Sequence, residues 1–125
     1  MHKLFLVAAL SLAVYTTVRA GDSLSSADKL ADRGSERLNR GDPEGAAEDF
    51  ASAIKLDRRS VKAYFGRAAL RLRAGLLDRA IEDYTRVVEL KPDSPVGFLA
   101  RGAAIQTGLK RCDQRFQQSN RIGEN

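Results

Sequence analysis

The chain repeats itself at an interval of 34 residues. Residues 27–60 and 61–94 align without a gap, and the alignment places large side chains on large ones and small on small. The paired positions are Leu30 with Tyr64, Arg33 with Arg67, Gly34 with Ala68, Gly41 with Gly75, Ala46 with Ala80, Asp49 with Asp83, Phe50 with Tyr84, Ala53 with Val87 and Leu56 with Leu90. A third copy begins at Pro95 and fades beyond Gly102. Such a period predicts a stack of similar short units.

Turn signals inside each copy predict two helices per unit. In the first copy, Gly41 can adopt the left-handed conformation that ends a helix. Asp42 suits the cap of the next helix and Pro43 suits its first position. Apolar residues then recur at helical spacing as far as Leu56. We therefore predict an antiparallel helix pair, with a second helix from Pro43 to Leu56 and with Ser60 capping the first helix of the next unit.

This pattern resembles the tetratricopeptide repeat family, whose unit is two antiparallel helices joined by a tight turn. The residues that carry the resemblance are large–small pairs four apart in the first helices and small–aromatic–small series in the second helices. They are Leu30 with Gly34, Tyr64 with Ala68, Phe98 with Gly102, then Ala46, Phe50, Ala53 and Ala80, Tyr84, Val87, with Pro92 closing the second unit. Two departures are Arg58 in place of the first closing proline and the missing small–aromatic–small series in the third copy.

The resemblance implies an all-α, right-handed solenoid of about two and a half to three repeats. Its units would be residues 27–60, residues 61–94 and a partial third repeat in residues 95–125. A polar capping helix is expected from Lys110 to about Arg121, because the end of a repeat array needs a polar outer face. We also expect Gly34, Ala68 and Gly102 to let the two helices of each unit approach closely.

A charged pair also repeats. Arg33 and Asp49 are separated by 16 residues and recur as Arg67 and Asp83, whereas Arg101 in the third copy has Gln117 at the acidic position. In a helical hairpin this spacing brings both side chains together across the turn. We predict a structural ion pair in each of the first two units, worth at most about 1 kcal/mol if exposed. The alternative is that these arginines form a ladder that binds a ligand.

The first 20 residues have the layout of a secretory signal peptide. A short basic lead precedes the apolar run Leu4 to Val14, and small residues flank a cut between Ala20 and Gly21. The run is shorter than the roughly 20 residues that cross a bilayer. We expect cleavage after Ala20, with an uncleaved anchor as the alternative. The mature chain would be exported, periplasmic in a bacterium and otherwise secreted, without membrane contact, and Gly21 to Ser26 would be a flexible tail in which Ser25 or Ser26 caps the first helix.

The residue types left after cleavage argue against catalysis and metal binding. The sole histidine, His2, lies in the signal segment, so the usual general base and commonest metal ligand would be lost. One cysteine, Cys112, cannot build a thiolate zinc site. We expect it to be half-buried in the last helix, or else to form an intermolecular disulfide. The sequence therefore predicts no enzyme, no cofactor and no metal.

In this family the partner lies on the concave surface, which one face of each unit's first helix forms. Tracing that face predicts the partner-binding residues Asp28, Ser35, Asn39, Lys62, Phe65, Arg73 and Leu99, and it also places Ala31 on this face. Phe65 and Leu99 are apolar anchors for an extended peptide or helix, or else pack against neighbouring helices. Some family members grip a chaperone's C-terminal carboxylate with lysines, asparagines and an arginine. The matching sites here are Ala31, Ser35, Phe65, Val96 and Ala100, so that clamp is absent.

We therefore predict an exported scaffold or adaptor that binds another protein or a peptide, with a possible homodimer and no nucleic acid. The first alternative is binding of nucleic acid or an anionic surface through basic residues, which are Arg37, Arg40, Arg71, Arg73, Lys110, Arg111 and Arg115. Against it, the mature chain has 19 Lys and Arg and 16 Asp and Glu, a formal charge of only +3. The second alternative is an enzyme that uses the acid pairs Glu48-Asp49 and Glu82-Asp83, whose periodic recurrence favours a surface role.

Overall fold

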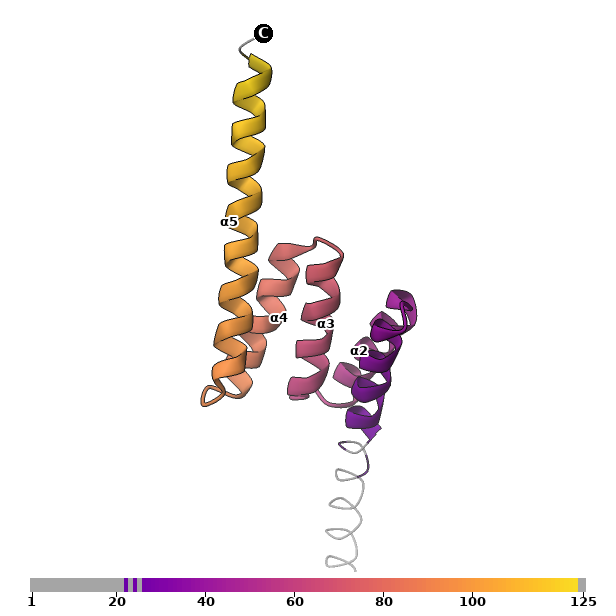
Figure 1. The fold of residues 1–125 in the computed structure, drawn as a ribbon. Helices are drawn as coiled ribbons and strands as arrows, with labels where there is room; N and C mark the ends of the chain where they lie inside the picture. The colour runs from indigo at the N-terminus through magenta and orange to yellow at the C-terminus, as the bar shows by residue number, and fades with distance from the viewer. Residues whose placement is uncertain (1–21, 23, 25, 124–125) are drawn as a thin grey trace, which may run out of the picture.

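The computed structural model describes residues 22, 24 and 26–123, and these residues form an array of antiparallel helices (Figure 1). A first helix covers residues 26–39. It is followed by α2 (Pro43–Leu56), α3 (Val61–Arg73), α4 (Leu77–Leu90) and α5 (Pro95–Gly123). The predicted all-α fold of helical hairpins is confirmed. The predicted signal peptide, residues 1–20, lies outside the described residues, and no described helix is both long and apolar enough to cross a membrane.

The start of the array differs from the prediction of a flexible tail over residues 21–26. The described residues of that segment, Asp22, Leu24 and Ser26, are helical. The Ser26 hydroxyl donates to the carbonyl oxygen of Asp22 at 2.8 Å, one helical turn earlier. A serine whose hydroxyl donates to the carbonyl four residues earlier lies inside a helix, so Ser26 is not the predicted cap.

The turns between helices use the predicted residues. Gly41 and Gly75 have φ values of 85° and 78°, in the left-handed region that favours glycine. The Asp42 side chain accepts a hydrogen bond from the Gly45 amide at 2.9 Å, and α2 begins at Pro43 and ends at Leu56 as predicted. The Ser60 hydroxyl oxygen accepts from the amide of the first turn of α3. Local sequence therefore decides where each hairpin bends.

The first core is built around the ring of Phe50, the one large side chain among the described residues with no exposed surface. A Cβ atom placed on Gly34 would lie only 2.9 Å from this ring, and one placed on Gly66 would overlap it. Phe50 thus contacts the first helix of its own unit and the first helix of the next. The predicted close approach at Gly34 is confirmed. The contact of Gly66 with Phe50 was not predicted, because Phe50 belongs to the preceding unit.

A second core joins the second unit to α5. It contains the buried residues Ala68, Ala80, Tyr84 and Ala104, with Phe65, Leu72, Ile81 and Ala100 packed against them. Ala68 lies between the helices of its unit, as predicted. Ala104 brings α5 against the same cluster, so the third unit is attached through small residues that permit a short distance between helices.

The C-terminal part departs most from the prediction. The segment Lys110 to Arg121 is helical, but it continues α5 instead of forming a separate capping helix. The reason is that Leu109 stands 34 residues after Gly75, so the third copy lacks the glycine that ends the first helix of each earlier unit. A Cβ atom on Gly102 would meet no described atom within 4 Å. The predicted close approach there is wrong, because no second helix packs on this face among the described residues.

Candidate binding groove

A groove of about 370 Å³ crosses the first helices of three successive units. We call it the binding groove. Its lining comes from the first helix, from α3, from one residue of α4, from the turn after α4 and from the start of α5. It consists of Asp32, Ser35, Val61, Lys62, Phe65, Gly66, Val87, Lys91, Ser94, Val96 and Gly97. Valine and phenylalanine side chains make an apolar floor, and charged and hydroxyl side chains make a polar rim. This combination suits a bound segment that offers both apolar side chains and backbone polar groups.

The floor is held in place by the second core. The rings of Phe65 and Tyr84 meet edge to face, with centroids 5.4 Å apart and an interplanar angle of 68°. Tyr84 is buried, and its burial raises the pKa of the phenol because the charged form would lose its hydration. Phe65 is half-buried and lines the groove with its remaining surface. It therefore packs against a neighbouring helix and also faces the groove.

The rim joins units one and two by an ion pair. Lys62 donates to both carboxylate oxygens of Asp32, at 3.0 Å and 3.2 Å. This hydrogen bond raises the pKa of Lys62. The Ser35 hydroxyl donates to the Ala31 carbonyl at 3.0 Å, which leaves its oxygen able to accept from a ligand. Because both members of the ion pair are exposed, a ligand can exchange one of these partners at small cost.

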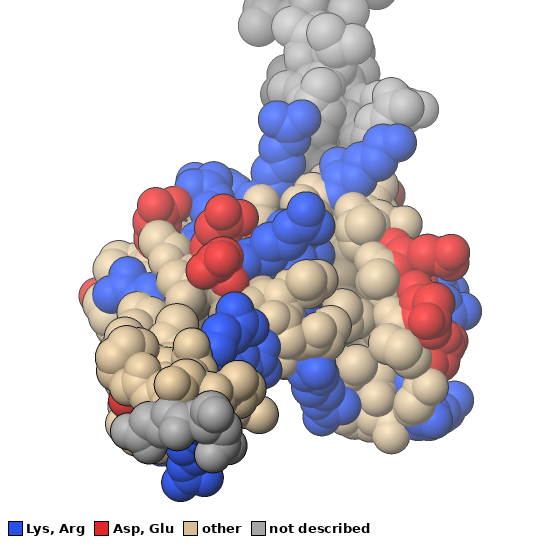
Figure 2. Space-filling model, turned by 90° about the horizontal axis from the view of Figure 1, so that it is seen from above, with Lys and Arg blue, Asp and Glu red and all other residues tan. Residues whose placement is uncertain are grey.

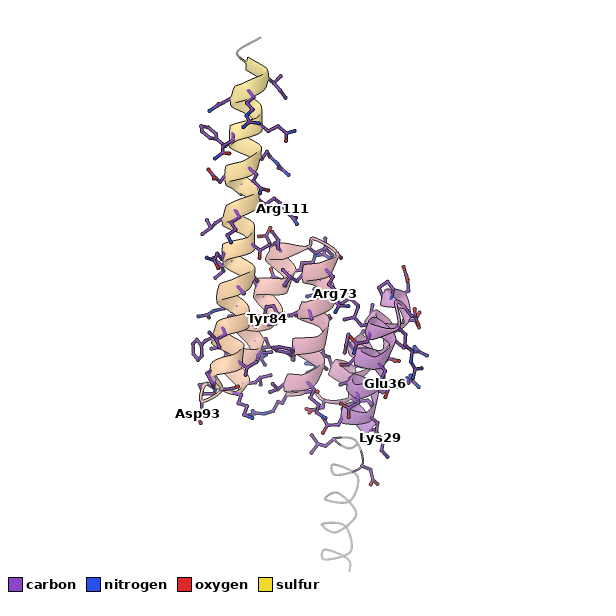
Figure 3. All side chains as sticks on the ribbon, in the orientation of Figure 1. Lys29, Glu36, Arg73, Tyr84, Asp93 and Arg111 are labelled. Atoms are coloured by element: carbon purple, nitrogen blue, oxygen red, sulfur yellow. The ribbon has the colours of Figure 1, made fainter. Side chains whose placement is uncertain are left out.

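The structure brings together three of the seven predicted partner-binding residues. Ser35, Lys62 and Phe65 line the groove, whereas the other four are not part of its lining; these are Asp28, Asn39, Arg73 and Leu99. Arg73 reaches from the end of α3 to the Leu38 carbonyl of the first helix at 3.5 Å, so it ties two units together (Figure 3). Ala31, traced onto the same face, is buried in the core beside Ala53 and Ala63.

Sequence reasoning missed several groove residues that come from other positions of the repeat. They are Asp32, Val61, Val87, Lys91 and Ser94. The predicted face passed through Ala31, so the adjacent residue Asp32 was left out. Val87 belongs to a second helix, and Lys91 and Ser94 belong to the turn before α5. A tracing that allowed two adjacent stripes and the turn between units would have included most of them.

Both predicted ion pairs are present in the structure. Arg33 donates to both carboxylate oxygens of Asp49 at 2.9 Å and 2.6 Å. Arg67 donates to both oxygens of Asp83 at 3.0 Å and 2.7 Å. The two-pronged guanidinium geometry fits a carboxylate and adds direction to the attraction. None of these four residues lines the groove.

A second arginine joins each pair, and the sequence analysis did not predict it. Arg37 lies 3.3 Å from Asp49, and Arg71 lies 2.7 Å from Asp83. Both aspartates are buried, so the limit of about 1 kcal/mol, which was given for exposed pairs, does not apply to them. Burial in a partly dehydrated site lowers the pKa of Arg71. In each cluster, arginines of the first helix bind an aspartate of the second helix and so join the two helices of the unit.

Acidification should destabilise the array through Asp49. Its hydrogen bond with Arg33 lowers the pKa of this carboxyl below the ordinary value. The unfolded chain then binds more protons than the folded chain, so the contribution is complete above about pH 4 and is lost as the pH falls through the folded-state pKa. Urea unfolding at pH 6 and at successively lower pH should show falling stability. The variant Asp49→Asn should be less stable at pH 6 and should lose this part of the dependence; an unchanged slope would contradict the assignment.

Charge on the described surface is mixed. Figure 2 shows Lys and Arg side chains spread over one face with Asp and Glu groups between them. Several arginines of the predicted basic alternative already have partners: Arg37 and Arg71 bind buried aspartates, and Arg40 lies 3.6 Å from Glu36. Arg111 donates to the Gly75 carbonyl at 3.3 Å (Figure 3). Each of these four arginines would have to give up an existing partner in order to bind a phosphate group.

Two of the sequence expectations concern metal ligands and the single cysteine. Within residues 22, 24 and 26–123, no three His, Cys, Asp or Glu side chains are grouped so as to hold a metal ion. Cys112 is exposed on α5 rather than half-buried as expected. Cys112 stands 34 residues after Asp78, in the segment that would have formed the second helix of the third unit but instead continues α5.

Two known proteins with similar sequences are named as Hsp70-Hsp90 organizing proteins. The chain is 28% identical over 91 residues to Hsp70-Hsp90 organizing protein 1 of Glycine max, a match that covers 73% of this chain and 16% of that protein. It is 32% identical over 72 residues to Hsp70-Hsp90 organizing protein 3 of Arabidopsis thaliana, which covers 58% and 13%. The chain therefore spans less than a fifth of the length of these relatives.

Solved structures share the fold. The second TPR of Spaghetti (RPAP3), bound to the HSP90 peptide SRMEEVD, has a TM-score of 0.64 at 24% identity, covering 79% of this chain and 91% of that one. The first TPR of Spaghetti, bound to the same peptide, has a TM-score of 0.59 at 21% identity, covering 82% and 90%. The tetratricopeptide repeat pattern itself matches residues 31–95, more than half of the 125 residues. With its 34-residue period and its stacked helical hairpins, the chain belongs to the tetratricopeptide repeat family.

Proposed function

We propose that this chain is a non-catalytic adaptor that binds an extended peptide segment of another protein in the binding groove. The observation that carries the proposal is the groove itself, which crosses three units and combines an apolar floor at Phe65 with polar groups at its edges. The fold is shared with solved TPR structures that are described as bound to an HSP90 peptide. The family is generally one of protein-interaction modules, and the described residues offer no arrangement that supports catalysis better.

The chemistry of the groove favours a peptide other than a chaperone's C-terminal tail. Clamping a terminal carboxylate requires several basic and amide side chains facing one point. Here Ala31 is buried, Val96 offers a methyl-bearing surface, and Lys62 shares its charge with Asp32. We propose a ligand with one or two apolar side chains for the floor and an acidic group that exchanges with Asp32 at Lys62.

We also propose that the mature chain acts outside the cytoplasm. The basic lead, the short apolar run and the small residues before Gly21 support export. The absence of histidine from residues 21–125, together with a single cysteine, is compatible with a binding module that carries no metal or redox centre. N-terminal sequencing of the protein recovered from its native host would test cleavage: a mature terminus at Gly21 supports it, and an intact Met1 contradicts it.

Filling the groove should abolish peptide binding. Val96 lines it and is exposed, so Val96→Trp would occupy its volume without disturbing the core. A library of random 12-residue peptides selected on residues 21–125 would supply a fluorescent probe. We expect Val96→Trp to weaken that probe at least tenfold, because a bulky ring removes the space and covers the apolar floor. The assay is fluorescence anisotropy.

Two variants make this test specific. Ile122→Trp adds the same ring at an exposed position near the end of α5 and should bind the probe as the wild type does. Leu99→Ala examines a predicted partner-binding residue that does not line the groove, and it should change the affinity less than twofold. Equal binding by Val96→Trp and wild type would contradict the proposed site, and a large loss in Leu99→Ala would move the site toward the open end of the array.

A further inference from the structure

Within the described part of the third unit, residues 95–123, one continuous helix takes the place of a helix pair. In units one and two, a second helix packs on the face of the first helix that carries the large–small pair, for example Ala80 and Tyr84 against Ala68. The corresponding face of α5 carries Phe98 and Gly102. In the structure Phe98 is 45% exposed and Gly102 has open space where a Cβ would point, although Gly34 in the first unit touches Phe50.

An arginine on this face repeats the geometry of its counterpart in unit two. The guanidinium carbon of Arg67 lies 5.4 Å from the centre of the Tyr64 ring, and that of Arg101 lies 5.5 Å from the centre of the Phe98 ring. Arg67 also binds the carboxylate of Asp83 from the second helix of its unit. Among the described residues, no carboxylate pairs with Arg101. The described part of the third unit therefore has the arginine and the aromatic ring, Arg101 and Phe98, but no counterpart of Asp83.

Apolar surface continues along α5 beyond this point. Ile105, Leu109 and Phe116 are exposed and follow Phe98 at spacings of 7, 4 and 7 residues, which places them along one side of the helix. Part of that side borders a hollow of about 750 Å³ between α5 and the start of α4. The α4 side of the hollow carries the apolar residues Leu76, Leu77 and Ile81 and the charged residues Asp78, Arg79 and Glu82. A helix laid here would touch α5 and α4 together.

The charge of α5 indicates what kind of helix would dock. Its basic residues are Arg101, Lys110, Arg111, Arg115 and Arg121, against the single acid Asp113. A second copy of α5 would bring like charges together, whereas an acidic helix would find complementary charge. The segments of this chain that carry the required pattern, α2 and α4, are already packed in their own units.

We propose that an acidic amphipathic helix of another protein docks on α5 and completes the third repeat. It takes the place of the missing second helix, with a small residue, an acid three positions later, an aromatic residue next to the acid and a second small residue after one more turn. This is the pattern of Ala46, Asp49, Phe50 and Ala53 in unit one. The acid pairs with Arg101, and the aromatic residue packs over Gly102. This surface is separate from the binding groove.

A helix taken from this chain provides the probe. A fluorescein-labelled peptide with the sequence Leu77–Leu90, stapled on its exposed side so that so short a segment stays helical, carries this pattern and a net charge of −2. We expect it to bind the intact chain in an anisotropy titration. Arg101→Gln should weaken binding about tenfold through loss of the charge-assisted pair, and Gly102→Leu at least tenfold by blocking the approach. The peptide with Asp83→Asn should bind wild type about tenfold more weakly and should show no further loss on Arg101→Gln.

Two control variants test whether binding depends on the Arg101 face of α5. Arg58→Gln removes an equal charge from an exposed turn and should leave the affinity unchanged. Lys62→Glu alters the binding groove and should also leave it unchanged, so the two proposals can fail independently. Equal binding by wild type and Arg101→Gln, or no binding at all, would overturn the proposal. So would sedimentation velocity that shows a dimer dissociated by Gly102→Leu, because the occupant would then be a second copy.

Discussion

Replacing Phe50 with alanine should lower the free energy of unfolding by about 3–5 kcal/mol, the range for removing a fully buried aromatic ring. The effect should be large because this ring fills the space above Gly34 and Gly66, so its loss opens a cavity between two units at once. A small repeat array has few other large core residues to compensate. Urea unfolding followed by helical circular dichroism would measure the change.

The matched control is Phe116→Ala. Phe116 is 66% exposed on α5, so removing its ring should change the stability by less than about 0.5 kcal/mol. Phe50→Leu should lie between the two, since leucine fills part of the same space. If Phe50→Ala unfolded at the same urea concentration as wild type, the two units would not be joined through this ring.

The change Asp83→Asn should have the next largest effect, about 2–3 kcal/mol. It removes the counterion of two arginines, Arg67 and Arg71, from a site where the aspartate is buried. Asp49→Asn should cost less, about 1–2 kcal/mol. The reason is that the Arg33 side chain is 55% exposed whereas that of Arg67 is 24% exposed, so water screens the first pair more strongly.

Double-mutant cycles would measure the interaction energy of each ion pair separately from the other effects of each substitution. The cycle on Arg67 and Asp83 should give a coupling energy above that on Arg33 and Asp49. The control is Asp78→Asn, an acid in the first turn of α4, which should cost no more than a few tenths of a kcal/mol. Equal coupling energies in both units would mean that burial of the arginine does not set the strength of these pairs.

The predictable parts of the fold are those set by residues that lie close together in the sequence. The end of one helix and the start of the next at Gly41, Asp42 and Pro43 depend on residues within a few positions of one another. The pairing of Arg33 with Asp49 depends on a hairpin whose turn is equally local. The long α5 could also have been read from the sequence, because Leu109 replaces the glycine of the earlier copies, but the expected repeat length favoured a break.

The candidate groove was predicted only in part, since its residues come from several units. Ser35, Lys62 and Phe65 were found by tracing one helix face. Asp32 and Val87 were not, because the rotation of each helix against its neighbours decides which stripe is buried and which lines the groove. A shift of one position buries Ala31 and exposes Asp32.

The repeat, the helical hairpins and the charged pairs could be predicted from the sequence alone, since these depend on spacing and on the conformational preferences of a few residues. Three other features depend on how the helices pack: the Phe50 ring lies against Gly66, each aspartate binds two arginines, and no described helix covers the Gly102 face of α5. Contacts between units depend on the distance and angle between whole helices, and those are set by packing over many residues together.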